Sequence, residues 1–287
     1  MVLVLIAKPG SGAINSRVVE ALRDTGGKAP RWLKLNDAAD IELFPGMMAF
    51  GEVLRDQPID VCLVGTQNRR KKLLLADMDS TMIHQECIDE LAFAAGVGDH
   101  IKAITAKAMR GELNFEGALK ERVSLLKGLD QSVINTLLRE RITFMEGAKT
   151  LIATMKAHGA YRALVSGGFT AFTGPVADAL GFDENHANIL LIENGKLTGG
   201  VAKPILGKDA KVEVLKKICK KLKISTDDAL AVGDGANDIP MLIEAGLGVA
   251  LHAKPNVQAE IPNCINHGDL TALLYLQGYR EDQFTVA

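Results

Sequence analysis

Cysteine is scarce in this 287-residue sequence, and its four cysteines are far apart. No C-x-x-C pair occurs, which argues against a cysteine-type zinc site and against a disulfide framework. We therefore interpret all four as reduced, mostly buried apolar side chains: Cys62, Cys87, Cys219 and Cys264.

A large net charge of either sign is also missing. The formal net charge is −2 and the sequence pI is about 6.3. The chain thus has no broad electrostatic field to attract a nucleic acid or an anionic membrane. A small molecule or another protein is the expected partner.

Long hydrophobic runs are absent. No segment has the ~18 uninterrupted apolar residues that a membrane helix needs. The N-terminal "MVLVLIA" has no basic leader and meets Lys8-Pro9-Gly10 at once, so we predict a first strand there. The expectation is a cytoplasmic protein without a membrane partner.

The chain, 47% hydrophobic, is long enough for about two domains. Residues 1–70 alternate apolar runs with polar helical stretches, which predicts a small α+β domain with a βαβ-βαβ rhythm. It ends at the basic "TQNRRKK", which we interpret as a solvated linker rather than a nucleic-acid contact.

Residues 71–287 follow a different rhythm. The apolar runs "KLLLAD", "YRALVSGG", "ALAVGDG" and "GLGVAL", with helical patterns between them, predict a parallel sheet covered on both faces. Residues of about 88–145 carry only helical periodicity and predict an insert after the first strand. Asn194-Gly195 predicts a hairpin that projects from the sheet.

Three predicted strands end in polar residues, and the carboxyl ends of parallel strands meet at one edge of a sheet. Asp77 and Asp79 follow the first strand, and Asp234 follows the third. Carboxylates held this close repel one another unless a cation intervenes. A hard divalent cation such as Mg²⁺ prefers such ligands, and a carboxylate can attack phosphorus. Asp77 is the predicted nucleophile and Asp79 the predicted acid/base.

A predicted anion cradle completes this edge. Ser166, with the amides of Gly167 and Gly168, precedes a predicted helix whose N-terminus favours a phosphate. A lysine would supply a fixed positive charge. Spacing alone leaves Lys208 and Lys211 in competition for that role.

The ordered motifs DMDST, VSGG, Lys211 and GDGAND resemble the haloacid dehalogenase (HAD) superfamily of aspartate-nucleophile phosphatases, over roughly residues 73–280. Within it, the match is closest to the branch that acts on phosphoserine. The resemblance implies a HAD-like Rossmannoid parallel sheet with a helical cap at about 88–145. It also implies magnesium-dependent hydrolysis of O-phospho-L-serine through an aspartyl-phosphate, the last step of serine biosynthesis.

The resemblance also implies roles for single residues. Asp77 is the nucleophile and Asp79 the acid/base. Magnesium is bound by the side chains of Asp77 and Asp234 and by the main-chain carbonyl of Asp79, while Asp238 supports the metal shell and Asn237 donates a hydrogen bond in the site. The phosphate-binding pair is Ser166 and Lys211, because the pattern AK-x-E-x-L favours the second lysine.

The cap is expected to choose the substrate. Glu86 resembles the acidic residue for the amine, and Arg122 resembles the arginine whose guanidinium takes the carboxylate. Phe115 and Met109 match residues that shield the ligand from water. The alternative interpretation is that Glu86 and Arg122 are solvated charges on helix surfaces, and that Phe115 and Met109 pack in the core.

Other interpretations stay open. Asp79 and Thr81 are also suited to capping the next helix. Residues 1–70 resemble a small amino-acid-binding module of the ACT type, for which dimerisation or structural support is an equal alternative to sensing. The whole chain could be a phosphotransferase with an acceptor such as homoserine, or a non-enzymatic amino-acid sensor.

Overall fold

The computed structural model describes residues 1–24, 28–42, 54, 56–109 and 112–285. Its central sheet has six strands, and every neighbouring pair is parallel. In spatial order they are β12 (Cys264–Ile265), β11 (Leu247–Leu251), β10 (Ala229–Gly233), β5 (Leu73–Ala76), β6 (Tyr161–Phe169) and β7 (Glu184–Asn188). The predicted parallel sheet is confirmed, and its order brings β5, β6 and β10 side by side.

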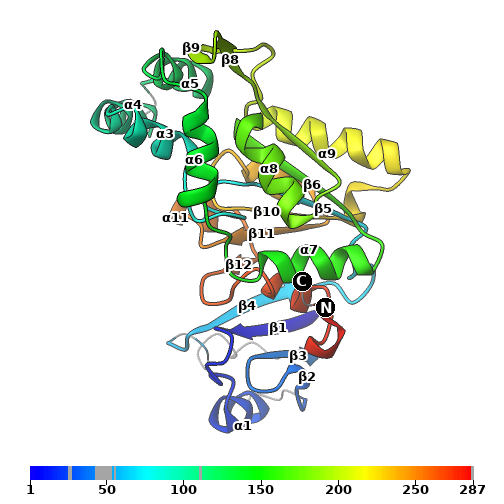
Figure 1. The fold of residues 1–287 in the computed structure, drawn as a ribbon. Helices are drawn as coiled ribbons and strands as arrows, with labels where there is room; N and C mark the ends of the chain where they lie inside the picture. The colour runs from blue at the N-terminus through cyan, green and yellow to red at the C-terminus, as the bar shows by residue number, and fades with distance from the viewer. Residues whose placement is uncertain (25–27, 43–53, 55, 110–111, 286–287) are drawn as a thin grey trace.

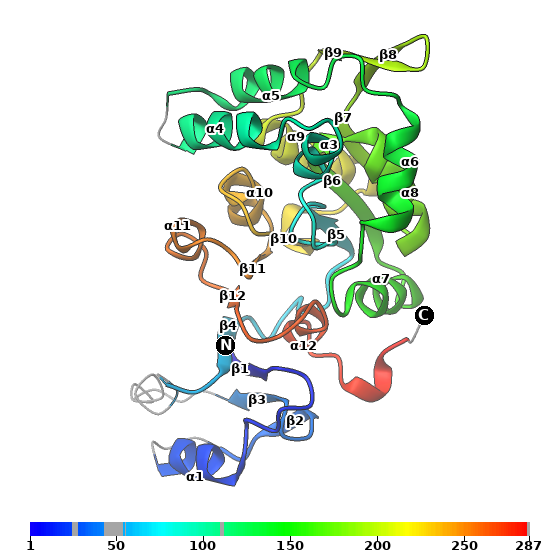
Figure 2. The same ribbon diagram turned by 60° about the vertical axis from the view of Figure 1, so that its left-hand side comes forward.

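Helices cover both faces of this sheet, as continuous apolar strands require. Alternate residues of β5 point to opposite sides: Leu74 and Ala76 into one core cluster, Leu73 and Leu75 into another. Figure 2 shows helices on both sides of the sheet. The first cluster includes residues of α7 (Ala148–Ala157), α8 (Thr170–Leu180) and α12 (Ala272–Leu276), and the second those of α9 (Lys208–Leu222), α10 (Ile239–Glu244) and α11 (Pro255–Gln258).

The helical insert forms a cap layer at one end of the molecule (Figure 1). Its helices are α3 (Cys87–Ala94), α4 (Gly98–Met109), α5 (Phe115–Ser124) and α6 (Ser132–Glu140). The two connections to the core lie beside each other, because His84 N donates to Thr143 O at 3.1 Å and Met145 N to Met82 O at 3.0 Å. These two segments therefore form a hydrogen-bonded connection between the helical insert and the core.

The predicted hairpin is β8 (Leu190–Glu193) and β9 (Lys196–Val201), turning through Asn194 and Gly195, which both have positive φ. It joins the cap rather than only projecting from the sheet. Gly128 N donates to Leu197 O, and Leu197 N to Leu129 O, each at 2.8 Å. The cap layer is thus larger than the predicted insert. The sequence did not predict the extra part, because pairing between distant segments leaves no local pattern.

A second, antiparallel sheet is built from the N-terminal residues. Its order is β2 (Arg31–Lys34), β3 (Ala38–Glu42), β1 (Val2–Ala7) and β4 (Ile59–Val64), with α1 (Ser16–Asp24) on one face. Strand β3, in the polar "AADIE", was not predicted. The second helix expected around "MMAFGEVLRD" lies almost wholly outside the described residues.

The other face of this second sheet packs on the core of the six-stranded sheet. Val4, Ile6 and Cys62 belong to the same apolar cluster as β12 and α12. The buried Asp60 carboxylate accepts hydrogen bonds from three successive backbone N–H groups, those of residues 266–268, at 2.7, 3.0 and 2.8 Å. The two sheets therefore share one core.

The linker prediction was wrong for one arginine. Both Arg69 Nη atoms donate to the buried Asp40 carboxylate at 2.7 Å, and its Nε donates to Leu276 O at 2.8 Å. A buried carboxylate needs a paired cation, and no local pattern reveals that need.

No described helix is long and apolar enough to span a membrane, as expected. All four cysteines are free, and three of them are buried.

Candidate active site

Three carboxylates meet beyond the carboxyl ends of β5 and β10. Asp77 directly follows β5, Asp234 directly follows β10, and Asp238 directly precedes α10. One oxygen of each lies within 4.8 Å of the other two. Asp77 and Asp238 are buried, and Asp234 is half-buried. The structure thus brings together the acidic residues that the sequence placed at this edge.

Lys211 lies against this carboxylate cluster. Its Nζ is 2.8 Å from Asp77 Oδ1 and 2.5 Å from Asp238 Oδ1, and the residue is 1% exposed. Burial acts to lower the lysine pKa, but the charges of Asp238 and Asp77 outweigh it and raise the pKa above its usual value. Lys211 stays protonated and compensates one of the three negative charges. The side chain of its competitor, Lys208, lies outside the described part of the structure.

The remaining negative charge is costly in a buried site. Burial, then the neighbouring Asp238, raises the pKa of Asp77 well above its usual range. Burial, then Asp238 and Glu86, raises the pKa of Asp234 to about 6. These shifts record an electrostatic demand for a further cation near the cluster.

A divalent metal fits this demand. Asp77 Oδ1 is buried, and although Lys211 is close, no described donor makes a hydrogen bond of suitable angles to it. The donor set is oxygen only, which suits a hard cation such as Mg²⁺ and not a thiolate-seeking metal. Asp77 can offer its Oδ1, and Asp234 is only half-buried, whereas both oxygens of Asp238 accept hydrogen bonds, one from Lys211 Nζ and one from Gly235 N at 3.1 Å.

The predicted anion cradle lies next to the cluster, where β6 ends and α8 begins. Gly168 N donates to the buried Ser166 Oγ at 2.8 Å. A Cβ added at Gly168 would lie 2.9 Å from Asp79 Oδ2 and 3.0 Å from Ser166 Oγ, closer than real Cβ atoms tolerate. Glycine is required here because the chain passes directly against Asp79.

Asp79 has contacts that bear on both of the alternatives considered for it. Its Oδ1 accepts from the backbone N–H of Cys87, the first residue of α3, at 3.2 Å, which is a capping contact. Its Oδ2 faces the glycine cradle. Burial, then the charge of Glu86, raises the pKa of Asp79 to about 7. A carboxyl group with that pKa can give and take a proton near neutral pH.

The cap contributes fewer contacts. Glu86 is exposed and accepts from Ser80 Oγ at 2.8 Å. Arg122 is half-buried, and its Nε donates to Ala118 O of its own helix at 3.2 Å. Burial lowers the pKa of Arg122, and the charges of Asp89 and Glu86 oppose that shift, so Glu86 lies within electrostatic range of the guanidinium.

The aromatic side chain of the cap covers the cradle. A Cβ at Gly167 would lie 3.2 Å from Phe115 Cζ, and one at Gly207 would lie 3.6 Å from Phe115 Cδ1. Phe115 is therefore in contact with the cradle rather than only with the cap interior. Met109 ends α4, but its side chain lies outside the described part of the structure.

Two polar contacts were missed from the sequence. Thr81 Oγ1 donates to Asp234 Oδ1 at 3.3 Å, although Thr81 had been considered only as a helix cap. Asn188, buried at the end of β7, hydrogen-bonds to Gly167 O at 2.8 Å. The sequence signal that could have indicated Asn188 was a polar asparagine at the end of a strand. Asn237 approaches Asp238 Oδ1 at 3.5 Å, beside the cluster.

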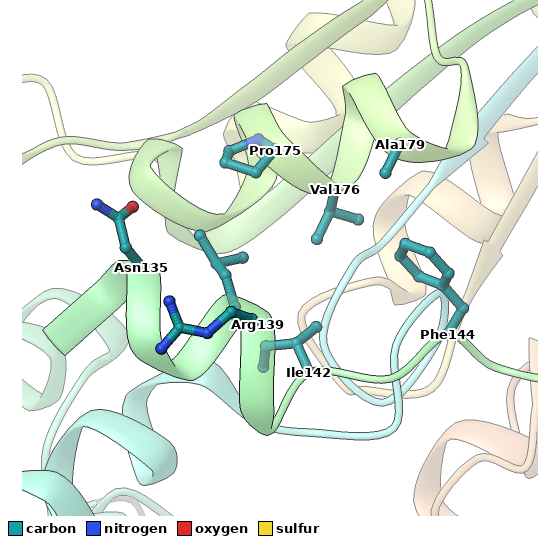
Figure 3. Close-up of a pocket in the computed structure, with 8 residues that line it drawn as sticks. Asn135, Arg139, Ile142, Phe144, Pro175, Val176 and Ala179 are labelled. Atoms are coloured by element: carbon teal, nitrogen blue, oxygen red, sulfur yellow. The ribbon is translucent and has the colours of Figure 1, made fainter. Parts of the chain in front are cut away.

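A cavity of about 370 Å³ lies elsewhere, between α6 and α8 (Figure 3). Its lining is mainly apolar and includes none of the predicted site residues. The residues are Asn135, Leu138, Arg139, Ile142, Phe144, Pro175, Val176 and Ala179. This cavity is therefore separate from the carboxylate cluster.

Comparisons with known proteins agree with this geometry. A family model for haloacid dehalogenase-like hydrolases matches residues 74–242. A phosphoserine phosphatase of Methanocaldococcus jannaschii is 45% identical over 206 residues, which cover 72% of this chain and 97% of that protein. One of Haemophilus influenzae is 45% identical over 204 residues, covering 71% of this chain but 65% of that protein.

A solved structure resembles nearly the whole chain, including the N-terminal sheet. It is a HAD family hydrolase from Salmonella enterica serovar Typhi, with a TM-score of 0.84 and 30% identity. The match covers 96% of this chain and 98% of that one.

Proposed function

The chain belongs to the haloacid dehalogenase-like hydrolase family, and we propose that it is a magnesium-dependent phosphatase that converts O-phospho-L-serine to L-serine and phosphate. The observation that carries the proposal is the contact of the buried Lys211 with Asp77 inside the three-carboxylate cluster. The names of the 45% identical relatives support the substrate.

Asp77 is the nucleophile in this proposal. Its carboxylate oxygen attacks phosphorus, the bond to the serine oxygen breaks, and Asp79 gives its proton to that oxygen. Asp79 then takes a proton from water, whose oxygen attacks the aspartyl-phosphate and releases phosphate and free Asp77. The pKa of about 7 for Asp79 supports both proton transfers.

The phosphoryl group needs positioning and neutralisation rather than further covalent chemistry. Lys211 and Ser166, with the backbone of Gly167 and Gly168, would hold its oxygens. Mg²⁺ bound by the side chains of Asp77 and Asp234 and by the Asp79 carbonyl would supply charge neutralisation there, with Asp238 and Asn237 supporting it.

The cap would recognise the rest of the substrate. Glu86 binds the ammonium group, Arg122 the carboxylate, and Phe115 with Met109 excludes water. We assign residues 71–287 to the phosphatase domain with its cap at about 88–145, and residues 1–70 to an ACT-like domain with a regulatory or dimerisation role. The proposed setting is cytoplasmic, at the last step of serine biosynthesis.

A substrate panel tests this function. Phosphate release would be measured with phosphoserine, phosphothreonine, phosphohomoserine and sugar phosphates, each with Mg²⁺ and with a chelator. The expected result is a preference for phosphoserine that needs the metal. Equal rates on sugar phosphates would overturn the substrate, and phosphorylated homoserine formed when homoserine is added would indicate a phosphotransferase.

A further inference from the structure

Asn188 uses its whole carboxamide to join two separate backbone segments. Its Nδ2 donates to Gly167 O at 2.8 Å and to Leu206 O at 3.3 Å, and its Oδ1 accepts from Leu206 N at 2.7 Å. The residue is 2% exposed. Asparagine is seldom buried this deeply unless its donors and acceptor are satisfied, and here they are.

The first segment is the anion cradle. Because a peptide unit is planar, holding the Gly167 carbonyl oxygen also fixes the direction of the N–H on the other side of the same peptide, that of Gly168. That N–H is the one that donates to Ser166 Oγ. Asn188 thus sets the orientation of a backbone donor without lying in the cradle itself.

The second segment leads into α9. Leu206 lies between the end of β9 and the start of α9, where the chain has no regular secondary structure. Asn188 binds both the N–H and the carbonyl of Leu206. The first turn of α9 carries Lys211, so a fixed Leu206 fixes where the helix begins and where its lysine points.

We propose that Asn188 is a positioning residue that locks the Ser166–Gly168 cradle and the start of the Lys211 helix into one preformed phosphate site. It does not touch the phosphate. The inference rests on the proposed function only in taking Ser166, the two glycine amides and Lys211 as phosphate ligands, which any phosphatase use of this site requires.

The test is a calorimetric titration of the full chain with inorganic phosphate in the presence of Mg²⁺. Asn188→Leu keeps the approximate shape but removes all three hydrogen bonds, so the phosphate Kd should rise roughly 10- to 100-fold. The Mg²⁺ affinity without phosphate should not fall, because the Asp77 and Asp234 ligands lie on other strands and a displaced Lys211 leaves their negative charge to the metal.

A control substitution on the same strand separates loss of the positioning role of Asn188 from a general loss of stability. Asn185 accepts a hydrogen bond from Thr173 Oγ1 at 2.7 Å, and its side chain has no described hydrogen bond to either segment. Asn185→Leu should leave the phosphate Kd within about twofold of the wild-type value, even if its melting temperature falls.

Asn188→Asp covers the case in which the leucine variant fails to fold. It retains an acceptor for Leu206 N, but its ionised carboxylate cannot donate to Gly167 O, so phosphate binding should again weaken while Mg²⁺ binding persists. Wild-type phosphate affinity in a folded Asn188 variant would overturn the inference, as would equal losses for phosphate and Mg²⁺. Failure of the wild type to hydrolyse phosphoserine would instead refute the proposed function and leave this titration valid.

Discussion

The two sides of the candidate active site differ in how completely they are held. On the core side, Asp77, Ser166 and Lys211 are at most 5% exposed, and their contacts join different strands and helices. On the cap side, the Glu86 side chain is exposed and the Arg122 guanidinium donates to a carbonyl of its own helix. The core side is organised before a ligand arrives, whereas the cap side has charges left for a ligand to pair.

In the proposed function, this difference places the chemistry on the core side and the substrate selectivity on the cap side. Preorganised charges at the sheet edge cost nothing to rearrange during reaction, which favours the phosphoryl transfer itself. In the proposed function, the less constrained charges of the cap pair with the substrate, and the cap keeps water from it. Substitutions on the two sides should therefore have different effects, on turnover and stability for the core side and on substrate use for the cap side.

The largest effect is expected for the proposed nucleophile. Asp77→Asn is nearly isosteric but cannot attack phosphorus, so turnover should fall by at least about 10⁴-fold. Phosphate release measures it, and circular dichroism checks that the fold persists. Retained turnover in this variant would refute the mechanism.

The next effect should appear in both stability and activity. Lys211→Met leaves Asp77 and Asp238 buried without their cation, which should cost about 3–5 kcal/mol of unfolding free energy. Urea denaturation measures the loss, and Mg²⁺ should restore part of it. Lys216→Met is the matched control, because in its 3.2 Å pair with Glu244 the lysine is exposed and the glutamate half-buried, and such a pair is worth ~1 kcal/mol or less.

On the cap side, the loss should be confined to substrate use. Arg122→Ala should lower kcat/KM for phosphoserine roughly 10- to 100-fold, since one charged hydrogen-bonding partner is removed. Affinity for inorganic phosphate should hold. Lys120→Ala on the same helix, which breaks an exposed pair with Glu116, is the control. Equal losses in the two variants would contradict a specific role for Arg122.

The smallest effect is expected for the serine that supports Glu86 by a side-chain hydrogen bond. Ser80 Oγ donates to Glu86 Oε1 at 2.8 Å, so Ser80→Ala should raise KM for phosphoserine about two- to fivefold without changing kcat. Steady-state kinetics measures the split. A fall in kcat at constant KM would place Ser80 on the core side of the comparison instead.

The same division explains what the sequence predicted. Asp77, Ser166 and Asp234 follow apolar runs of strand length, and parallel strands bring such ends together whatever the rest of the chain does. The local patterns predicted the central sheet, the cap helices and the Asn194-Gly195 turn. Lys211 needed the family resemblance, because spacing alone did not separate it from Lys208.

The misses are contacts between segments far apart in the chain. The bond from Asn188 to Gly167, the pair of Arg69 with Asp40, and the docking of Leu197 on the cap have no signature within a short window. Each involves a polar group whose partner only the folded chain supplies. Strand β3 was missed because its sequence has a single β-branched residue.

The shared core of the two sheets has a consequence for the order in which a nascent chain can fold. The hydrogen-bond partner of Asp60 lies 206 residues later in the chain. At ~5–20 residues per second, the ribosome needs roughly 10–40 s to synthesise that interval. Protease cleavage within β4 of ribosome-bound chains stalled before Cys264 would report that interval. One face of the N-terminal sheet is then covered only after residues 265–279, which pack against it, have been synthesised.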